Sequence, residues 1–159
     1  MEIMLQQVGI EHAESWLRLQ VEAYMPTFER YRDTETSPAM ETPEKVRRRM
    51  EHPSCRHFFI LCDGRTVGGI LVHSLAGNAK AMRLGNLFIL PDARDRGIGR
   101  KALALAEALY PEASSWELDT ILEEARNIHF YERAGYVRRG EPRKINENMH
   151  LIDFQKIMI

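Results

Sequence analysis

The chain has 159 residues, of which 44% are hydrophobic and 28% are charged, and its formal net charge is −1. This length and composition are typical of one soluble globular domain, here over residues 1–159, with enough chain to bury a core. The near-zero charge argues against bulk electrostatic attraction to nucleic acid or to a membrane surface, and we expect neither as a partner.

The sequence also gives expectations for metal binding and for the compartment. Two cysteines, Cys55 and Cys62, are too few for a disulfide scaffold or a four-ligand zinc site, and we expect no metal. The N-terminal segment lacks the basic and apolar regions of a signal peptide, and no apolar run reaches the roughly 18 residues of a membrane helix. Together these features predict a cytoplasmic protein with reduced thiols.

The N-terminal third predicts one strand and two helices. A short strand over 2–8 is followed by apolar residues at helical spacing, which predict a helix over 11–24. Residues 25–42 contain two prolines, turn formers and aromatic residues, and predict a long, partly helical loop of the kind that often binds ligands. A proline at the first position marks the start of a helix over 43–51.

The middle of the chain predicts three antiparallel strands in sequence. In "HFFILCDGRTVGGILVHSL" two apolar runs are joined by Asp63-Gly64, a pair that favours a tight primed turn. Gly77-Asn78 supplies the next turn, before a strand over 81–90.

The C-terminal part predicts two helices and three strands. An alanine- and leucine-rich helix begins at 98, a strand spans 116–121, and a helix over 123–134 ends at Gly135 as its cap. "YVRRG" and "NMHLIDFQKIMI" are the last strands. The resulting order is typical of an α+β fold, a three-layer α/β/α sandwich. Its central sheet is mixed and mostly antiparallel, with about seven strands and helices on both faces.

The segment "PDARDRGIGRKAL" over 91–103 carries the chemistry. Glycine in a helix costs about 1 kcal/mol relative to alanine, yet Gly97 and Gly99 stand where a helix begins. The first turn of a helix has unpaired N–H groups and partial positive charge, and bare glycine backbone lets a phosphate approach it. Four basic residues surround the same point: Arg94, Arg96, Arg100 and Lys101. This arrangement suits a pyrophosphate.

The glycines do not match two other phosphate-binding motifs. The P-loop pattern Gly-x-x-x-x-Gly-Lys-Ser/Thr is absent, and a dinucleotide fingerprint needs glycine where Ala102 stands. The remaining alternative is that Gly97 and Gly99 only form a tight turn between strand and helix.

Two segments resemble the GNAT superfamily of N-acetyltransferases. "LFILPDARDRGIGRKAL" is similar to the acetyl-CoA motif of that family, Arg/Gln-x-x-Gly-x-Gly/Ala, with Arg94, Gly97 and Gly99 in its three fixed places. "ARNIHFYERAGY" over 125–136 is similar to a later motif of the family, which has an Asn, an aromatic-Tyr pair and a Gly-aromatic pair at this spacing. The element order fits along nearly the whole chain, least well in the N-terminal helices.

The resemblance implies a GNAT-type acyl-CoA N-acyltransferase fold that binds acetyl-CoA. The strand that ends at Leu90 would splay from the strand over 116–121, and the pantetheine arm would lie in that gap, pairing with strand backbone. Backbone groups of Phe88, Ile89 and Leu90 would contact pantetheine and the acetyl carbonyl. Asn127 would hydrogen-bond the pantetheine arm. Backbone N–H groups of one continuous segment would hold the pyrophosphate: Arg94, Asp95, Arg96, Gly97, Ile98, Gly99 and Arg100.

The chemistry implied by the resemblance is direct attack of an amine on the thioester, which needs a free amine, an oxyanion donor and an acid for the sulfur. Tyr131 is the expected acid, because its ordinary pKa near 10 keeps it protonated. The alternatives are that Tyr131 only packs with Phe130 and that Asn127 is a surface residue. Many family members carry a second Asn where this chain has Glu124, so no role is transferred to that position.

The general base is not marked by the sequence, because the strand before the glycine loop lacks the Glu that many members use. Six polar residues are candidates, and none is favoured: His73, Asn86, Glu117, Asp119, Glu41 and Asp33.

The acceptor is expected opposite the cofactor, between the loop over 25–42 and the last strand pair. Four residues are predicted to contact it: Tyr24, Phe28, Tyr31 and Glu41. Aromatic walls with scattered acids suit a cationic amine. The basic run over 138–148 either meets an acidic substrate or forms a solvated turn between strands.

The expected function is an N-acetyltransferase that moves an acetyl group from acetyl-CoA to a primary amine by direct attack in a ternary complex. The acceptor is a small molecule or a peptide or protein amine. The alternatives are a non-catalytic acetyl-CoA-binding sensor and a transferase that uses another acyl-CoA or an alcohol. A nucleic-acid-binding role for the arginines is disfavoured by the neutral charge. A homodimer is an expectation by analogy with the family.

Overall fold

The computed structural model describes residues 1–75 and 78–159. Within them, seven strands form one sheet in the order β1-β2-β3-β4-β5-β7-β6. Neighbouring strands are antiparallel, except for β4 and β5, which run parallel. The predicted α+β sandwich with a mixed, mostly antiparallel sheet is therefore confirmed.

The strands and helices follow each other along the chain as β1 (Ile3–Val8), α1 (Ala13–Tyr31), α2 (Pro43–Glu51), β2 (Cys55–Cys62), β3 (Arg65–Leu75), β4 (Asn78–Ile89), α3 (Ile98–Ala108), β5 (Ser115–Ile121), α4 (Ala125–Arg133), β6 (Val137–Asn146) and β7 (Met149–Ile157). Short 3₁₀ helices lie at Ile10–His12, Pro38–Met40 and Pro91–Ala93. Among the residues that the structure describes, no helix is long and apolar enough to cross a membrane.

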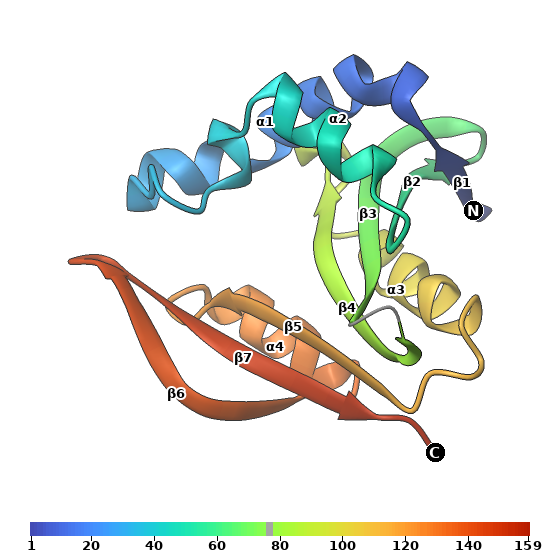
Figure 1. Ribbon diagram of the computed structural model, residues 1–159. Coiled ribbons are helices and arrows are strands. Elements are labelled where there is room, and N and C mark those ends of the chain that lie inside the picture. Colours follow the sequence, from blue (N-terminus) through green and yellow to red (C-terminus); the bar gives the residue numbers. More distant parts are fainter. Residues whose placement is uncertain (76–77) are drawn as a thin grey trace.

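Helices cover the sheet on both sides (Figure 1). Helices α1 and α2 bury one face, where Trp16 packs with Phe59 and Phe88. Helices α3 and α4 bury the other face, whose cluster includes Leu103 and Trp116. Each layer forms because its helices carry an apolar stripe, which is removed from water when the helices pack on the sheet.

Local sequence signals account for several element ends. Asp63 and Gly64 have φ values of 50° and 84°, as the predicted primed turn between β2 and β3 requires. The Thr42 hydroxyl accepts the Lys45 N–H at 3.2 Å and caps α2. Gly135 follows α4 with φ 97° and forms its predicted C-terminal cap.

The segment over 25–42, predicted as a partly helical loop, is regular helix in its first part, because α1 does not end near Tyr24 but continues through Pro26 to Tyr31. A proline inside a helix removes one backbone hydrogen bond, but contacts from distant elements hold these turns. The Arg94 guanidinium donates to the Ala23 carbonyl at 2.7 Å, and the Tyr31 hydroxyl donates to Glu124 at 2.7 Å. Arg32, at φ 54°, then ends the helix.

The C-terminal hairpin corrects a second prediction. The run over 138–148 is not a turn for most of its length, because β6 extends from Val137 to Asn146. The register with β7 shifts between Arg139 and Arg143, which accommodates Gly140 at φ 73° and Pro142. Pro142 is tolerated because β6 is an edge strand, where a missing N–H leaves no partner unpaired.

Strand β4 is longer than predicted and begins at Asn78, while the turn predicted at Gly77-Asn78 includes Gly77, which lies outside the described residues. Strand β4 pairs with β5 only from Ala81 to Arg83, although its pairing with β3 continues to Ile89. The two parallel strands therefore separate, and the β5-facing edge of β4 is left without a strand neighbour.

Candidate functional site

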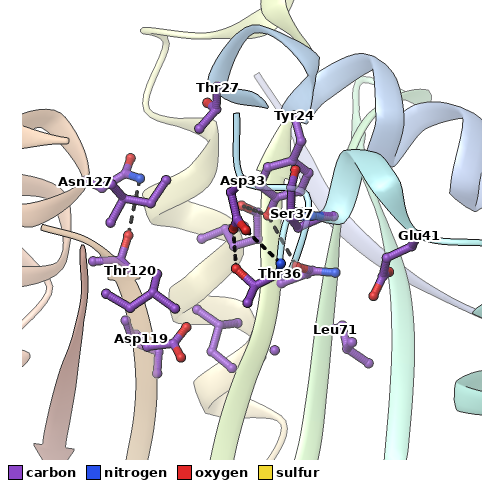
Figure 2. Close-up of a pocket in the computed structure, with 18 of the residues that line it drawn as sticks. Tyr24, Thr27, Asp33, Thr36, Ser37, Glu41, Leu71, Asp119, Thr120 and Asn127 are labelled. Carbon is purple, nitrogen blue, oxygen red and sulfur yellow. Dashed lines mark hydrogen bonds between the residues drawn. The ribbon is translucent and has the colours of Figure 1, made fainter. Parts of the chain in front are cut away.

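A cavity of about 780 Å³ lies where β4 and β5 separate. This volume is within the range of small-molecule sites. Residues of α1, the loop before α2, β4, β5, α4 and β7 all contribute to its walls. Figure 2 shows Asn127 and Thr120 on one side of the cavity, Glu41 and Leu71 on the other, and Tyr24 and Asp33 between them.

The free edge of β4 forms one wall of this cavity. Leu71 lies opposite Asn86 and Val72 opposite Leu84, so Gly85 is the extra residue of a β-bulge at this edge. Nearer the loop, two backbone groups of the predicted cofactor strand are already bonded. The Ile89 carbonyl accepts the Arg94 side chain at 3.0 Å, and the Leu90 N–H donates to the Val67 carbonyl at 2.8 Å. Phe88 is buried beneath α1.

The loop between β4 and α3 is held by the Arg94 side chain and shaped by its own backbone geometry. Besides its bond to Ile89, the Arg94 guanidinium donates to the Ala23 carbonyl, so this side chain fastens the loop to α1. Asp95 has φ 63°, and Gly97, at φ 78°, is the N-cap residue of α3 and makes no side-chain cap. The first N–H groups of α3 therefore remain available to a ligand.

Glycine occupies positions 97 and 99 of the loop for different physical reasons. Gly97 is in the left-handed region, which glycine adopts without strain, so the tight turn accounts for it. A Cβ added at Gly99 would lie 3.5 Å from Phe130 and 3.7 Å from Ile89, which is ordinary contact. The fold itself does not require glycine at 99, and the bare backbone there is what the approach of a phosphate needs.

The two remaining residues of the predicted cofactor site lie on α4. Asn127 is exposed and donates to the Thr120 hydroxyl at 3.3 Å, and it lines the cavity. Tyr131 also lines the cavity, and its ring packs at 5.0 Å from Phe130. Burial above all, and also the nearby Tyr24 and Asp119, raises the pKa of Tyr131 above its ordinary value of 10.0. Its hydroxyl is therefore a proton donor at neutral pH.

The sequence matches the model of one family, described as the Acetyltransferase (GNAT) family, over residues 13–136. The chain belongs to this family. The resemblance inferred from the two motifs is thereby confirmed, and the chain is an acyltransferase by family and fold. The sequence matches no curated protein at a significant level.

Solved structures share the GNAT fold along nearly the whole chain. An acetyltransferase from Thermus thermophilus is 18% identical, with 99% of this chain and 98% of that chain covered and a TM-score of 0.76. The PaiA N-acetyltransferase from Thermoplasma acidophilum, in complex with coenzyme A, is 16% identical, with coverage of 99% and 100% and a TM-score of 0.71. The spermidine N-acetyltransferase from Vibrio cholerae, in complex with CoA and spermine, is 15% identical, with coverage of 98% and 95% and a TM-score of 0.75.

In this GNAT chain all four residues predicted to contact the acceptor line the cavity: Tyr24, Phe28, Tyr31 and Glu41. The Tyr24 hydroxyl reaches the free edge of β4, with the Leu87 carbonyl at 3.3 Å and Asn86 Oδ1 at 3.4 Å. The Tyr31 hydroxyl instead bonds Glu124, which also pairs with Arg30.

The acidic candidates for a general base already have partners. Asp33 is buried, and it accepts the Glu35 and Thr36 N–H groups at 3.0 and 2.8 Å. Burial raises the pKa of Glu41, but bonds from Arg49 at 2.5 Å and Gln20 at 2.7 Å outweigh it and hold that pKa below 4.5.

Two acids of β5, Glu117 and Asp119, also form ion pairs with arginines. Arg83 lies 3.2 Å from Glu117 and 3.2 Å from Asp119, and Arg143 lies 3.0 Å from Asp119. His73 differs, because it lines the cavity as a neutral group. Burial, with the positive charges of Arg83 and Arg49, lowers its pKa below the ordinary 6.5.

Two contributors to the site were not predicted from the sequence. Arg126 forms an exposed ion pair with Asp95 and links α4 to the glycine loop. Gln20 is fully buried beside the cavity. A signal existed for Gln20, since it stands four residues after Trp16 on the apolar stripe of α1, where a polar side chain needs a specific partner. No pattern marks Arg126 among the other exposed arginines.

Proposed function

We propose that this chain is an N-acetyltransferase that transfers an acetyl group from acetyl-CoA to a primary amine within a ternary complex. The observation that carries the proposal is the free edge of β4, which opens into the same cavity as Tyr131 and the aromatic acceptor wall. An extended ligand can add to such an edge through backbone hydrogen bonds.

In this proposal the cofactor lies along β4 and ends at the glycine loop. Backbone N–H groups from Arg94 to Arg100 hold the pyrophosphate, and Asn127 bonds the pantetheine arm. Along Phe88–Leu90, contacts to pantetheine come from the groups left available by Arg94, Val67 and the pairing with β3. The Ile89 carbonyl and the Leu90 N–H are already bonded, and Phe88 pairs with Gly69.

Tyr131 acts as the acid in the proposed reaction. The nitrogen of the neutral amine bonds to the carbonyl carbon, the C–S bond breaks, and the sulfur takes the Tyr131 proton. The nitrogen releases one proton, and Tyr131 regains one from solvent. Its raised pKa keeps the phenol protonated until this step.

His73 is the best-fitted group to remove the amine proton, through water. It lines the cavity and is neutral at pH 7, whereas the carboxylates at 41, 117 and 119 already form ion pairs with arginines. A base whose pKa is below 6.5 gives an acidic limb of the rate profile below pH 6.5.

The acceptor in this proposal is a primary amine, supported by the aromatic wall of Tyr24, Phe28 and Tyr31. Release of the CoA thiol with spermidine, 2-phenylethylamine or alanine amide tests the proposal, with product masses measured in parallel. We expect amine-dependent thiol release and an acetylated product. Tight acetyl-CoA binding without transfer to any of the three would instead favour the sensor alternative.

A further inference from the structure

A chain of hydrogen bonds runs from the interior of α1 to the bulge of β4. Gln20 has no exposed surface, and its amide makes four hydrogen bonds. Oε1 accepts Trp16 Nε1 at 2.9 Å and Asn86 Nδ2 at 3.2 Å. Nε2 donates to the Pro38 carbonyl at 2.9 Å and to Glu41 at 2.7 Å. These four bonds use the amide's full capacity.

The partners of Gln20 leave its amide one orientation. The Pro38 carbonyl and the Glu41 carboxylate only accept, so the NH₂ group of Gln20 must face them. The Trp16 N–H only donates, so the oxygen of Gln20 faces Trp16 and, with it, Asn86. The group that Asn86 presents to Gln20 is therefore its NH₂, and Oδ1 turns toward the Tyr24 hydroxyl.

With the Asn86 amide in this orientation, the free edge of β4 has more hydrogen-bond acceptors than donors. The single proton of the Tyr24 hydroxyl faces two acceptors, the Leu87 carbonyl at 3.3 Å and Asn86 Oδ1 at 3.4 Å. A phenol can donate to only one acceptor well, and both contacts are long. An acceptor atom at the cavity wall is therefore left for a donor that the ligand brings.

The position of Asn86 along β4 indicates which part of the ligand brings the hydrogen-bond donor. Asn86 lines the cavity four residues before Leu90, which corresponds to roughly 13 Å of strand from the start of the glycine loop. On the proposed cofactor path this is the end where the acetyl group meets the acceptor, beyond the part of β4 assigned to pantetheine.

We infer that Asn86 Oδ1 accepts a hydrogen bond from the attacking amine and so aligns it for reaction, with Gln20 as the positioning residue that fixes the Asn86 amide. This inference rests on the proposed function. A primary amine has two N–H groups, of which one proton leaves during transfer and the other remains in the product amide. Asn86 holds the hydrogen that remains.

The inference makes a prediction that depends on the substrate. A secondary amine has only one N–H, and it must lose that proton, so it has none left for Asn86. We expect the wild type to prefer a primary amine over its N-methyl derivative. In Asn86→Ala the ratio of the two kcat/KM values should fall by about 10-fold, as for one lost hydrogen bond.

The experiment uses whichever of spermidine, 2-phenylethylamine and alanine amide is acetylated fastest, together with the derivative in which every primary amine is N-methylated. Asn78→Ala, at the exposed far end of β4, is the matched control and should keep the wild-type ratio. Gln20→Met should lower the ratio in the same direction, since it frees the Asn86 amide to rotate. The affinity for CoA should change less than about twofold in Asn86→Ala.

The outcomes separate the inference from the proposed function. An active wild type with an unchanged ratio in Asn86→Ala overturns the inference and leaves the transferase intact. A wild type that acetylates none of the three amines contradicts both. If Asn86→Ala does not fold, Asn86→Ser replaces it. Because the ratio is measured within one protein sample, partial loss of folded protein does not alter it.

Discussion

The proposed cofactor loop and the acceptor side of the cavity are built by different means. The loop from Leu90 to Ile98 is shaped by backbone conformation, with Asp95 and Gly97 at positive φ and bare backbone at Gly99. On the acceptor side, buried side chains that start from Gln20 set the wall through directed hydrogen bonds. A backbone site suits a ligand shared by a whole family, whereas side-chain bonds can change with the acceptor.

Tyr131 lines the cavity and is the proposed acid, so its removal should have the largest effect. We expect Tyr131→Phe to lower kcat by about 10²- to 10⁴-fold, because one proton-transfer group is lost. The affinity for CoA should stay the same, since the ring remains packed on Phe130. Steady-state kinetics and calorimetric titration with CoA measure the two effects.

The pH profile of the wild type sharpens this prediction. With the Tyr131 pKa raised above 10.0, no basic limb belonging to this residue should occur below pH 10. A limb in that range that disappears in Tyr131→Phe would show that the pKa of Tyr131 is not raised.

His57 is a buried polar residue beneath α1, and it should make the stability of the protein depend on pH. It is 1% exposed beneath α1, with its ring 4.8 Å from that of Trp16. Burial and the Arg49 charge lower its pKa from 6.5 to about 4. The unfolded chain therefore binds a proton near pH 6.5 that the folded chain does not bind until about pH 4, so stability falls as the pH drops through this window.

We expect this residue to make unfolding about 2 kcal/mol easier at pH 5 than at pH 7. In His57→Phe, which keeps an aromatic ring against Trp16, that part of the pH dependence should be lost. Urea unfolding of both proteins at the two pH values measures the difference. Equal pH dependence in wild type and variant would show that His57 is not held neutral.

Several features of the molecule follow from short-range signals. The strand and helix periodicities, the Asp63-Gly64 turn and the cap at Gly135 depend on residues a few positions apart, and each was predictable. The same holds for the glycine loop and for Asn127 and Tyr131, because each of the two motifs is continuous in sequence. Of these residues, Asn127 and Tyr131 line the cavity.

Other features depend on contacts that the sequence does not display. Helix α1 passes Pro26 because Arg94 and Glu124 bind its last turns from elsewhere in the chain. Strand β6 passes Pro142 because it lies at the sheet edge. The sequence did not rank the candidate general bases. The acids at 33, 41, 117 and 119 differ from His73 because each already has a hydrogen-bond or ion-pair partner in the folded chain.

The ion pair between Asp95 and Arg126 should give the smallest effect. Both side chains are about 70% exposed, at 69% and 72%, and exposed pairs contribute about 0–1 kcal/mol. We expect Arg126→Gln to change the free energy of unfolding by less than about 0.5 kcal/mol. A larger loss in urea unfolding would mean that the Arg126 side chain, in addition to Arg94, holds the glycine loop.

The central claim is that the bare backbone at Gly99 receives the pyrophosphate of acetyl-CoA. Calorimetric titration of Gly99→Val with acetyl-CoA tests it most directly, with Gly99→Ala as the smaller step and circular dichroism to verify the fold. A Cβ at this position meets only ordinary contacts, so we predict a folded protein whose affinity falls by about 10-fold or more, the loss of one or more charge-assisted hydrogen bonds. A folded Gly99→Val protein with wild-type affinity would contradict the assignment.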